Sequence, residues 1–293
     1  MLHVIINPIA GKGHALDILD QVRSELDRRS LEYAVKETEY AGHATVLARE
    51  AAQAGADVAA CGGDGTVCEV LGGMVDSGVT LYVVPCGTGN DFVKSFYGLS
   101  RDPITALCQQ LDGEPVQVDC GRVNQGAFLN VAGAGFDVEV LSQLSRFRDC
   151  GKGLKPYLYA VGAALRHFRP LECEVTLDGQ TARHSLTILS IANGQYIGGG
   201  MRVAREARLD DGLFDVILAK RLPRPLIALC LPFFINGSFV RLPICRQVRC
   251  REVIVRASGL TVNVDGELRA VDEARFTLLP GHLRMRRPKS ENT

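Results

Sequence analysis

The sequence predicts a two-domain protein, an α/β domain followed by an antiparallel β-sandwich domain. The chain has 293 residues, and at about 150 residues per domain this length favours two hydrophobic cores. Up to about residue 115, short apolar runs alternate with segments of helical period, whereas from about 117 onward short apolar runs are separated by Gly and Asp-Gly. The first pattern is typical of a mostly parallel sheet and the second of a sandwich. We expect an α/β domain at 1–120, which the tail 278–293 could join, and a sandwich at 121–277.

The elements of the first domain follow from this alternation. The expected strands are residues 2–6, 33–38, 57–61 and 80–85, and the expected helices are residues 15–29, 44–54 and 66–74. In the first helix Leu16, Leu19, Val22 and Leu26 recur at spacings of 3, 3 and 4, which places them on one face that we expect to be buried. Helices between parallel strands predict a three-layer fold around the sheet.

The second domain is expected to consist mainly of short strands. Apolar runs suited to strands cover residues 116–123, 126–136, 172–180, 185–193, 212–221, 251–259, 260–268 and 274–280. The Asp178-Gly179 pair indicates a hairpin, and helices are expected at 156–168 and 223–235. The apolar segment 223–235 precedes a stretch rich in arginine. It fits either a core helix or a helix that faces an anionic membrane surface, and both interpretations stay open.

The composition excludes some classes of protein. Lys plus Arg and Asp plus Glu number 33 each, so no overall positive field favours nucleic acid, and an anionic partner must be met by a local cluster. The ten cysteines are scattered without a CxxC pair, which favours reduced thiols and a cytoplasmic protein. The N-terminus lacks the features of a secretory signal, and we expect no transmembrane segment because no apolar stretch reaches about 20 residues. Peripheral membrane association remains open.

Three glycine-containing segments follow expected strands of the first domain. They are Asn7–Gly13, Cys61–Thr66 and Pro85–Phe92, and at the carboxyl ends of parallel strands they would border one crevice. Bare glycine backbone and a helix N-terminus suit phosphate oxygens. The second segment is the most specific, because Asp64 adds a carboxylate for Mg²⁺ and Thr66 a hydroxyl for a phosphate or a helix cap. The first segment alone could be a plain turn, and Asn90 and Asp91 of the third could be helix caps.

These segments carry a resemblance to a known family. NPIAGKG, GGDGT and GTGNDF, in this order within the first hundred residues, closely resemble the catalytic domain of the diacylglycerol kinase family, especially its soluble bacterial lipid kinases. The resemblance continues through LDDGLF at 209–214 and VNVDGE at 262–267, and so covers nearly the whole chain. NAD kinases and phosphofructokinases share a GGDG loop, so that loop alone is ambiguous, but the other four segments favour the lipid kinases.

The resemblance implies an ATP site in the first domain, in a cleft that faces the second. Carried over by motif, the nucleotide contacts are Asn7, Pro8, Ile9, Ala10, Gly11, Thr38, Gly62, Gly63, Asp64, Gly65, Thr66, Val67, Cys68 and Thr88. Cys68 departs from the family, which usually has Asn at this position. A side-chain hydrogen bond from that Asn is therefore in doubt, whereas backbone contacts should survive.

The resemblance also implies roles for two turns of the second domain. By itself Asp210-Asp211-Gly212 indicates a turn, but in similar kinases this segment holds a structural Mg²⁺, here through the Asp211 side chain and the carbonyls of Arg208 and Leu213. Asp265-Gly266 indicates a hairpin turn. The resemblance makes Glu267 the general base that activates the attacking hydroxyl, with Asp265 as the second candidate or as a residue that orients the site.

The expected function is that of an ATP- and Mg²⁺-dependent lipid kinase. It would phosphorylate a lipid hydroxyl at a membrane surface, with diacylglycerol as the default acceptor and phosphatidic acid as the product. One alternative is a kinase of NAD or another small molecule. Another is a nucleotide-binding regulator without transfer activity, which Cys68 keeps open although Asp64, Asp211 and Glu267 argue against it. The sequence also leaves a homodimer open.

Overall fold

The first half of the chain folds around a parallel sheet. The computed structural model describes residues 1–147, 150 and 155–289. The sheet has the order β2-β1-β3-β4 and all its pairs are parallel. Its strands are β1 (Leu2–Ile6), β2 (Tyr33–Glu37), β3 (Asp57–Gly62) and β4 (Leu81–Pro85). The alternation of strands and helices predicted this topology.

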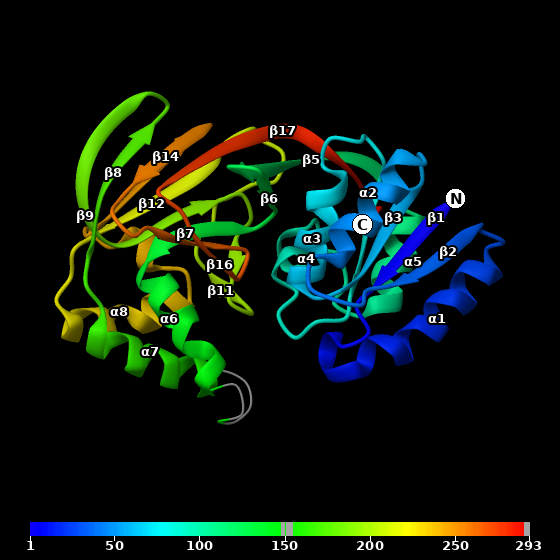
Figure 1. Ribbon diagram of the computed structural model, residues 1–293, viewed down its shortest axis with the longest axis horizontal. Coiled ribbons are helices and arrows are strands. Elements are labelled where there is room, and N and C mark those ends of the chain that lie inside the picture. The colour runs from blue at the N-terminus through cyan, green and yellow to red at the C-terminus, as the bar shows by residue number, and fades with distance from the viewer. Residues whose placement is uncertain (148–149, 151–154, 290–293) are drawn as a thin grey trace.

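Helices cover both faces of this sheet, as Figure 1 shows. The helices are α1 (His14–Arg28), α2 (His43–Gln53), α3 (Asp64–Met74), α4 (Asp91–Ser95) and α5 (Pro103–Leu111). One core cluster joins α1 and α5 to the sheet through Leu26 and Leu107, and another joins α2, α3 and α4 to its other face through Leu47, Val70 and Phe92. The predicted three layers are confirmed, although α4 and α5 were not foreseen.

One predicted core position of α1 is wrong. Leu16 is 44% exposed, whereas its neighbour Ala15 is fully buried. Leu19, Val22 and Leu26 are buried as expected. The buried face therefore runs through spacings of 4, 3 and 4 from Ala15, which packs in the same core cluster as Leu19, Val22 and Leu26.

The second half of the chain forms an antiparallel sandwich. Its main sheet has the order β16-β15-β7-β9-β8-β14-β17-β5-β6, with β12 paired to β9 and β13, and a separate pair, β10-β11, lies beside it. One core cluster brings together side chains from five different strands, among them Phe128, Phe214, Val253, Val262 and Phe276. The strands are β5 (Glu114–Val123), β6 (Gly126–Phe128), β7 (Val131–Gly135), β8 (Leu171–Leu177), β9 (Gln180–Ala192), β10 (Tyr196–Ile197), β11 (Met201–Arg202), β12 (Phe214–Lys220), β13 (Cys245–Cys250), β14 (Glu252–Arg256), β15 (Thr261–Val264), β16 (Glu267–Ala270) and β17 (Glu273–Arg287).

Both predicted Asp-Gly hairpins are present. Asp178 and Gly179 join β8 to β9, and Asp265 and Gly266 join β15 to β16. All four residues have positive φ, between 43° and 96°, as the mirror-image two-residue turn requires.

Three helices pack against the lower part of the sandwich in Figure 1. They are α6 (Phe136–Leu144), α7 (Lys155–His167) and α8 (Arg224–Ile235), and they share a core cluster with strand residues such as Ile188 and Ile217. The apolar run 126–136 was expected to be one strand, but it forms β6, β7 and the first residue of α6. Gly135, with φ 104°, turns the chain out of the sheet at that point. In the described residues, no helix has the length and apolarity needed to cross a membrane.

Strands β5 and β17 run through both halves of the molecule. They pair antiparallel along almost their whole length, with one irregularity between Leu279 and Leu283. Phe276 belongs to the sandwich core, whereas Leu283 and Met285 belong to the core of the first half. The exact division at residue 120 and the assignment of the tail stay predictions.

Candidate active site

The three glycine segments lie side by side at one edge of the parallel sheet. Asn7 follows β1, and its backbone amide donates to the backbone carbonyl of Cys61 at 3.1 Å. Cys86 follows β4, and its backbone amide donates to the backbone carbonyl of Gly62 at 2.8 Å. A side chain at Gly11 would collide with the carbonyl oxygen of Cys86. All three segments therefore meet at the carboxyl ends of the strands, where the sequence predicted a crevice.

The second and third loops approach each other most closely at two glycines. A Cβ on Gly63 would lie 3.2 Å from the Cα of Gly87, and a Cβ on Gly87 would clash with Gly63. Asn90, in the left-handed region with φ 51°, closes the third loop by exchanging side-chain hydrogen bonds with the backbone of Gly87 at 3.1 and 2.9 Å. Asn90 is the residue before α4, but its side chain bonds back to the loop and does not cap the helix.

Asp64 lies at the first position of α3 and points toward the third loop. Its Oδ1 accepts the backbone amides of Asp91 at 2.6 Å and Phe92 at 3.4 Å. A side chain at position 89 would place its Cβ 2.6 Å from Asp64 Oδ2. Glycine at this position therefore leaves enough space for the Asp64 carboxylate. Burial raises the pKa of Asp64, and the nearby carboxylate of Asp91 adds to the rise. Helix α3 begins at Asp64 and not at Thr66 or Val67 as the pattern suggested.

The other expected nucleotide residues fall into two groups. Thr38 follows β2 and donates its amide to Ile6 at 2.9 Å, so it ends at the same edge of the sheet. The residues of the three glycine segments that are exposed or half-buried include Pro8, Ile9, Ala10, Gly65 and Thr88. Thr66 is buried and accepts a weak hydrogen bond from Asn7 Nδ2 at 3.4 Å, so it holds the first loop to the second.

Val67 and Cys68 are placed differently. Both are buried, and the amide of Val67 is bonded to the carbonyl of Gly63 at 3.1 Å. The thiol of Cys68 points to the sandwich, where it donates to the carbonyl of Ala127 at 3.4 Å. Both side chains are therefore buried, and the Cys68 thiol is a contact between the two halves of the molecule.

The β15–β16 turn presents two carboxylates in different states. Asp265 accepts the backbone amides of Leu129, Asn130 and Val131 at 2.7 to 3.0 Å. Burial raises the pKa of Asp265 to about 7, and the charge of Asp64 contributes to the rise, so the carboxylates of Asp265 and Asp64 are close enough for their charges to interact. Glu267 is 44% exposed and forms an ion pair with Arg269 at 3.0 Å. Glu267 is thus the accessible carboxylate, and Asp265 fixes the turn.

Asp91 joins the two halves through Gly199 and is paired with Lys94, two residues that the sequence did not single out. The Asp91 carboxylate accepts the ammonium of Lys94 at 2.7 Å and the amide of Gly199 at 2.7 Å. The side chains of Asp91 and Lys94 are only 7% and 6% exposed. Gly199 belongs to a run of three consecutive glycines at 198–200, all with positive φ. The run of glycines was the sequence signal for an unusual backbone conformation here.

The Asp210-Asp211-Gly212 turn lies between β13 and β5, which it contacts through Arg249 and Asp119. The Asp211 carboxylate pairs with the guanidinium of Arg249 and also accepts the amide of Leu213 at 3.1 Å. The amide of Gly212 donates to the buried Asp119 at 2.7 Å. Sequence reasoning missed Asp119, although an acidic residue within the apolar strand run 116–123 was a visible signal.

This turn can be compared with what a hard cation needs. One carboxylate and carbonyl oxygens, as expected from Asp211, Arg208 and Leu213, are ligands that Mg²⁺ accepts. Nearby Asp215 Oδ2 is buried without a hydrogen-bond partner, so the region can accept more positive charge. Among the described residues, no three His, Cys, Asp or Glu side chains are grouped to hold a metal. A cation therefore fits only if Arg249 releases Asp211.

A narrow apolar cavity, which the sequence did not reveal, lies between the three helices and the sandwich. Asp137, at the start of α6, points into it with Oδ1 unpartnered, and burial raises the pKa of this group to about 6. Asn263 donates to Asp137 at 3.3 Å and accepts the amide of Gly266 at 2.9 Å. The polar end of the cavity is thus linked to the Asp265-Gly266 turn. The lining side chains are Phe136, Asp137, Tyr157, Thr187, Ile188, Leu222, Ile227, Cys230, Leu231, Phe234 and Phe239.

Comparisons with known proteins cover both halves of the chain. Residues 1–123 match the diacylglycerol kinase catalytic domain, and residues 130–287 match the YegS C-terminal NAD kinase beta sandwich-like domain. A diacylglycerol kinase of Mycobacterium tuberculosis is 29% identical over 231 residues, which is 77% of this chain and 74% of the relative. A probable YegS-like lipid kinase of Pseudomonas putida is 32% identical over 223 residues, which is 76% of this chain and 72% of the relative.

A solved structure supports the same relationship. The crystal structure of a diacylglycerol kinase from Bacillus anthracis superimposes with a TM-score of 0.76 at 25% identity, covering 99% of this chain and 97% of the other. The similarity therefore extends over both halves and over the way they are joined.

Proposed function

The chain belongs to the diacylglycerol kinase catalytic-domain family of lipid kinases, and from this we propose that it transfers the γ-phosphoryl group of ATP to the hydroxyl of diacylglycerol. The observation that carries the proposal is the placement of Glu267. It is an accessible carboxylate on the turn of Asp265, whose own carboxylate is close enough to Asp64 of the second glycine loop for their charges to interact. Phosphoryl transfer depends mainly on positioning and on neutralising charge, and a base held on this turn would contribute to the positioning.

ATP would lie along the edge of the parallel sheet. Its phosphates would meet backbone amides of the segments around Asn7, Gly62 and Gly87, together with the N-terminus of α3, because such groups bind anions without needing net positive charge. Contacts to Thr38 and Thr88 would hold the nucleoside side of the site. Asp64 would hold the divalent cation of the nucleotide, and that cation would neutralise charge on the β- and γ-phosphates.

Glu267 would act as the general base. Its carboxylate accepts the proton of the lipid hydroxyl while the hydroxyl oxygen attacks the γ-phosphorus. The bond between the γ-phosphorus and the bridging oxygen breaks, and ADP leaves. Asp265 would keep the turn in place through its three backbone hydrogen bonds. Because these bonds occupy its carboxylate oxygens, Asp265 would not be the base that accepts the proton of the lipid hydroxyl.

The acceptor would approach from the side of α7 and α8. The apolar cavity between these helices and the sandwich has a polar end at Asp137, which Asn263 connects to the catalytic turn. An acyl chain in this cavity would place the head of the lipid toward Glu267. The cavity is narrow, with a volume of about 20 Å³, so α7 and α8 would have to part when the lipid enters. The apolar lining favours a lipid over NAD or another polar acceptor.

A second role concerns the turn at Asp211. We infer that this turn holds a structural Mg²⁺ through the Asp211 side chain and the carbonyls of Arg208 and Leu213, and that Arg249 competes with the ion for the Asp211 carboxylate. The ion would tie β12 to the strands around Asp119 and would not take part in the transfer.

The test is an acceptor panel. The protein is incubated with γ-labelled ATP and Mg²⁺ and with diacylglycerol, monoacylglycerol, sphingosine or ceramide in mixed micelles, and separately with NAD. The proposal expects label in phosphatidic acid. Label in NADP would favour the small-molecule alternative, and no label in any acceptor, with ATP binding intact, would favour a regulator.

A further inference from the structure

Helix α8 has apolar side chains on both its inner and its outer face. Ile227, Cys230 and Phe234 are buried against the sandwich. Leu229 is 67% exposed and Phe233 is 42% exposed, and they lie on the opposite side of the helix. A surface helix normally presents polar residues outward. Helix α8 therefore has one apolar face buried in the core and a second apolar face that is exposed.

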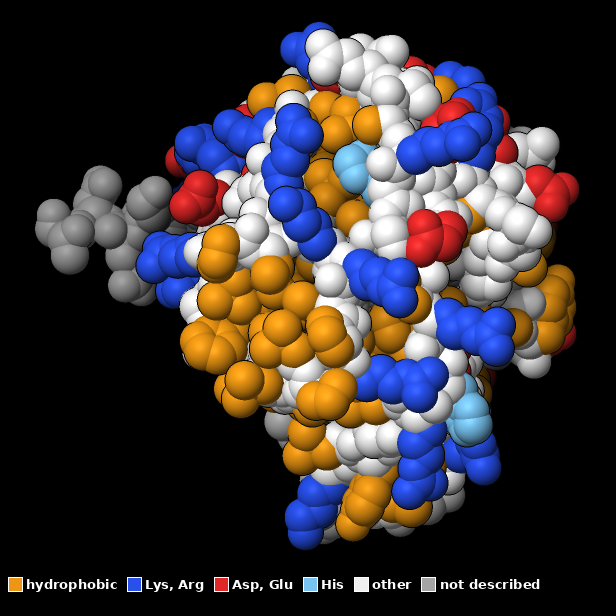
Figure 2. Space-filling view, turned by 90° about the vertical axis from the view of Figure 1, so that its left-hand side faces the viewer, with side chains coloured by type: hydrophobic (Ala, Val, Ile, Leu, Met, Phe, Trp, Pro, Cys, Tyr) orange, Lys and Arg blue, Asp and Glu red, His pale blue; other side chains and the backbone are white. Residues whose placement is uncertain are grey.

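The outer face of α8 continues into a larger apolar patch. Leu226 on α8 and Leu158 and Tyr159 on α7 are also exposed, by 38%, 46% and 56%. The two helices are neighbours in the fold. Figure 2 shows apolar side chains gathered on this side of the molecule, with Lys and Arg beside them.

The two segments that carry this patch have side-chain charges of one sign. Residues 155–170 and 220–242 contain seven Lys or Arg and no Asp or Glu, although the whole chain has 33 of each sign. All seven are exposed, and none forms an ion pair with a carboxylate in the part of the chain that the structure describes. The seven are Lys155, Arg166, Arg169, Lys220, Arg221, Arg224 and Arg241.

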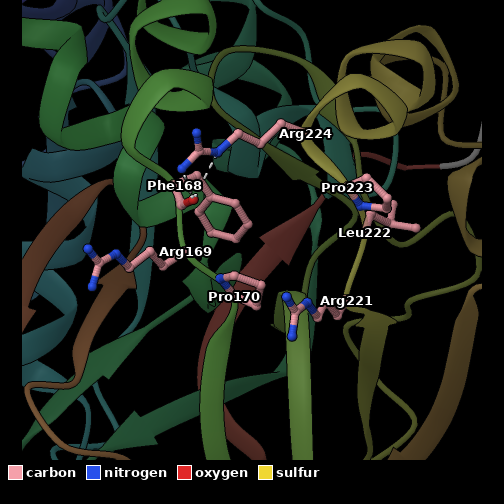
Figure 3. Close-up of a pocket in the computed structure, with 7 residues that line it drawn as sticks. All are labelled: Phe168, Arg169, Pro170, Arg221, Leu222, Pro223 and Arg224. Atoms are coloured by element: carbon pink, nitrogen blue, oxygen red, sulfur yellow. Dashed lines mark hydrogen bonds between the residues drawn. The ribbon is translucent and has the colours of Figure 1, made fainter.

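Three of these arginines surround a hollow between the end of α7 and the start of α8. The hollow has a volume of about 590 Å³ and is lined by Phe168, Arg169, Pro170, Arg221, Leu222, Pro223 and Arg224. Arg224 donates to the carbonyl of Phe168 at 3.2 and 3.3 Å, which fixes its guanidinium at the rim. Figure 3 shows the Arg169 side chain extending away from the other lining residues and the Arg221 side chain on the other side of Pro170. Exposed guanidinium groups at the rim of a hollow suit a phosphate.

We propose that this face, made of α7, α8 and the arginine-lined hollow, docks onto a bilayer of anionic phospholipid. The exposed Leu and Phe side chains enter the acyl region, the cations lie at the level of the headgroups, and a lipid phosphate occupies the hollow. A nucleic acid would account for the charge but not for exposed side chains such as Leu229. The proposal goes beyond the proposed reaction, since it concerns where the enzyme binds and not what it transfers.

Vesicle binding tests the proposal without any catalytic step. The full chain, without ATP or diacylglycerol, is sedimented with vesicles of phosphatidylcholine alone and with vesicles that also contain phosphatidylglycerol. We expect binding to the anionic vesicles only. Replacing Arg169→Gln and Arg221→Gln together should weaken binding about 25-fold, because each cation near such a surface contributes about fivefold. Leu229→Ser should weaken it about tenfold.

A matched pair separates this face from total charge. Arg49→Gln with Arg101→Gln removes two exposed cations from the first half of the chain and should leave vesicle binding unchanged. Added salt should weaken binding of the wild type and of Leu229→Ser, but it should affect the Arg169/Arg221 variant less. Equal binding to neutral and anionic vesicles, or equal loss in the control pair, would overturn the proposal. A protein that transfers no phosphate in the acceptor panel can still bind anionic vesicles. Failure of the proposed function and failure of the docking proposal are therefore distinguishable.

Discussion

The backbone amide of Gly199 donates to the carboxylate of Asp91 over 2.7 Å, and this bond joins the sandwich to the third glycine loop. The amide of Asp91 in turn donates to Asp64 at 2.6 Å. A continuous line of hydrogen bonds therefore runs from the carboxylate assigned to the nucleotide cation to the opposite half of the molecule. The position of Asp64 depends on how the two halves meet.

The buried ion pair in this line should be important for stability. Asp91→Ala would leave Lys94 almost fully buried without its carboxylate, which costs about 3 kcal/mol or more. Chemical denaturation should show this loss in the free energy of unfolding. The double variant Asp91→Ala with Lys94→Met removes the stranded charge and should recover part of the loss. An unchanged stability of Asp91→Ala would contradict the role of the pair.

The close approach of Gly63 and Gly87 should control nucleotide affinity. Gly87→Ala places a methyl group against the backbone of Gly63, so the second and third loops must separate and ATP binding should fall about tenfold or more, on the scale of one to two lost phosphate hydrogen bonds. Gly162→Ala in α7, where no atom lies within 4 Å of the new methyl group, is the matched control and should bind ATP normally. Isothermal titration with a non-hydrolysable ATP analogue measures both, and equal affinities would refute the argument.

Asp265 should make stability depend on pH. Its pKa is raised from 3.8 to about 7 in the folded protein. Between these values the folded state keeps a proton that the unfolded state has lost, so the free energy of unfolding falls as pH rises, by up to about 4 kcal/mol in all. Asp265→Asn lacks this dependence. Urea denaturation at pH 4.5 and 8 should therefore show the wild type losing stability relative to the variant, and a constant difference would show that Asp265 does not titrate in this range.

Arg249 and Mg²⁺ should compete for Asp211. If the turn binds Mg²⁺, the ion raises the melting temperature of the wild type, and Arg249→Gln increases the apparent affinity because the Asp211 carboxylate is no longer paired. Asp211→Ala should abolish the effect of Mg²⁺ on melting. Thermal scans over a Mg²⁺ titration, with ATP absent, measure all three proteins. No response in the wild type and in Arg249→Gln would remove the metal from this turn.

Local sequence patterns predicted the parallel sheet and the meeting of its three loops, because parallel strands end at one edge. The same patterns failed at Leu16, where the small Ala15 takes the buried position, and at 126–136, where a glycine turn splits an apolar run. The contacts of Asp91 with Gly199 and of Cys68 with Ala127 could not be foreseen, since they depend on how two separately predictable units approach each other. Asp119 and Asp137 are single polar residues in apolar segments, and only the fold gives their partners.

The roles of the individual site residues rest on the family resemblance and on geometry together. The Glu267 carboxylate is accessible, whereas the Asp265 carboxylate is buried and held by backbone amides. This difference is the strongest structural reason to assign the base to Glu267.

The most direct test compares Glu267→Gln with the wild type in transfer of labelled phosphate from ATP to diacylglycerol in mixed micelles, with ATP affinity measured in parallel. A side chain of equal shape that cannot accept the proton should lower the transfer rate by about 100-fold or more and leave ATP binding unchanged. Full transfer activity in Glu267→Gln would contradict the proposed mechanism.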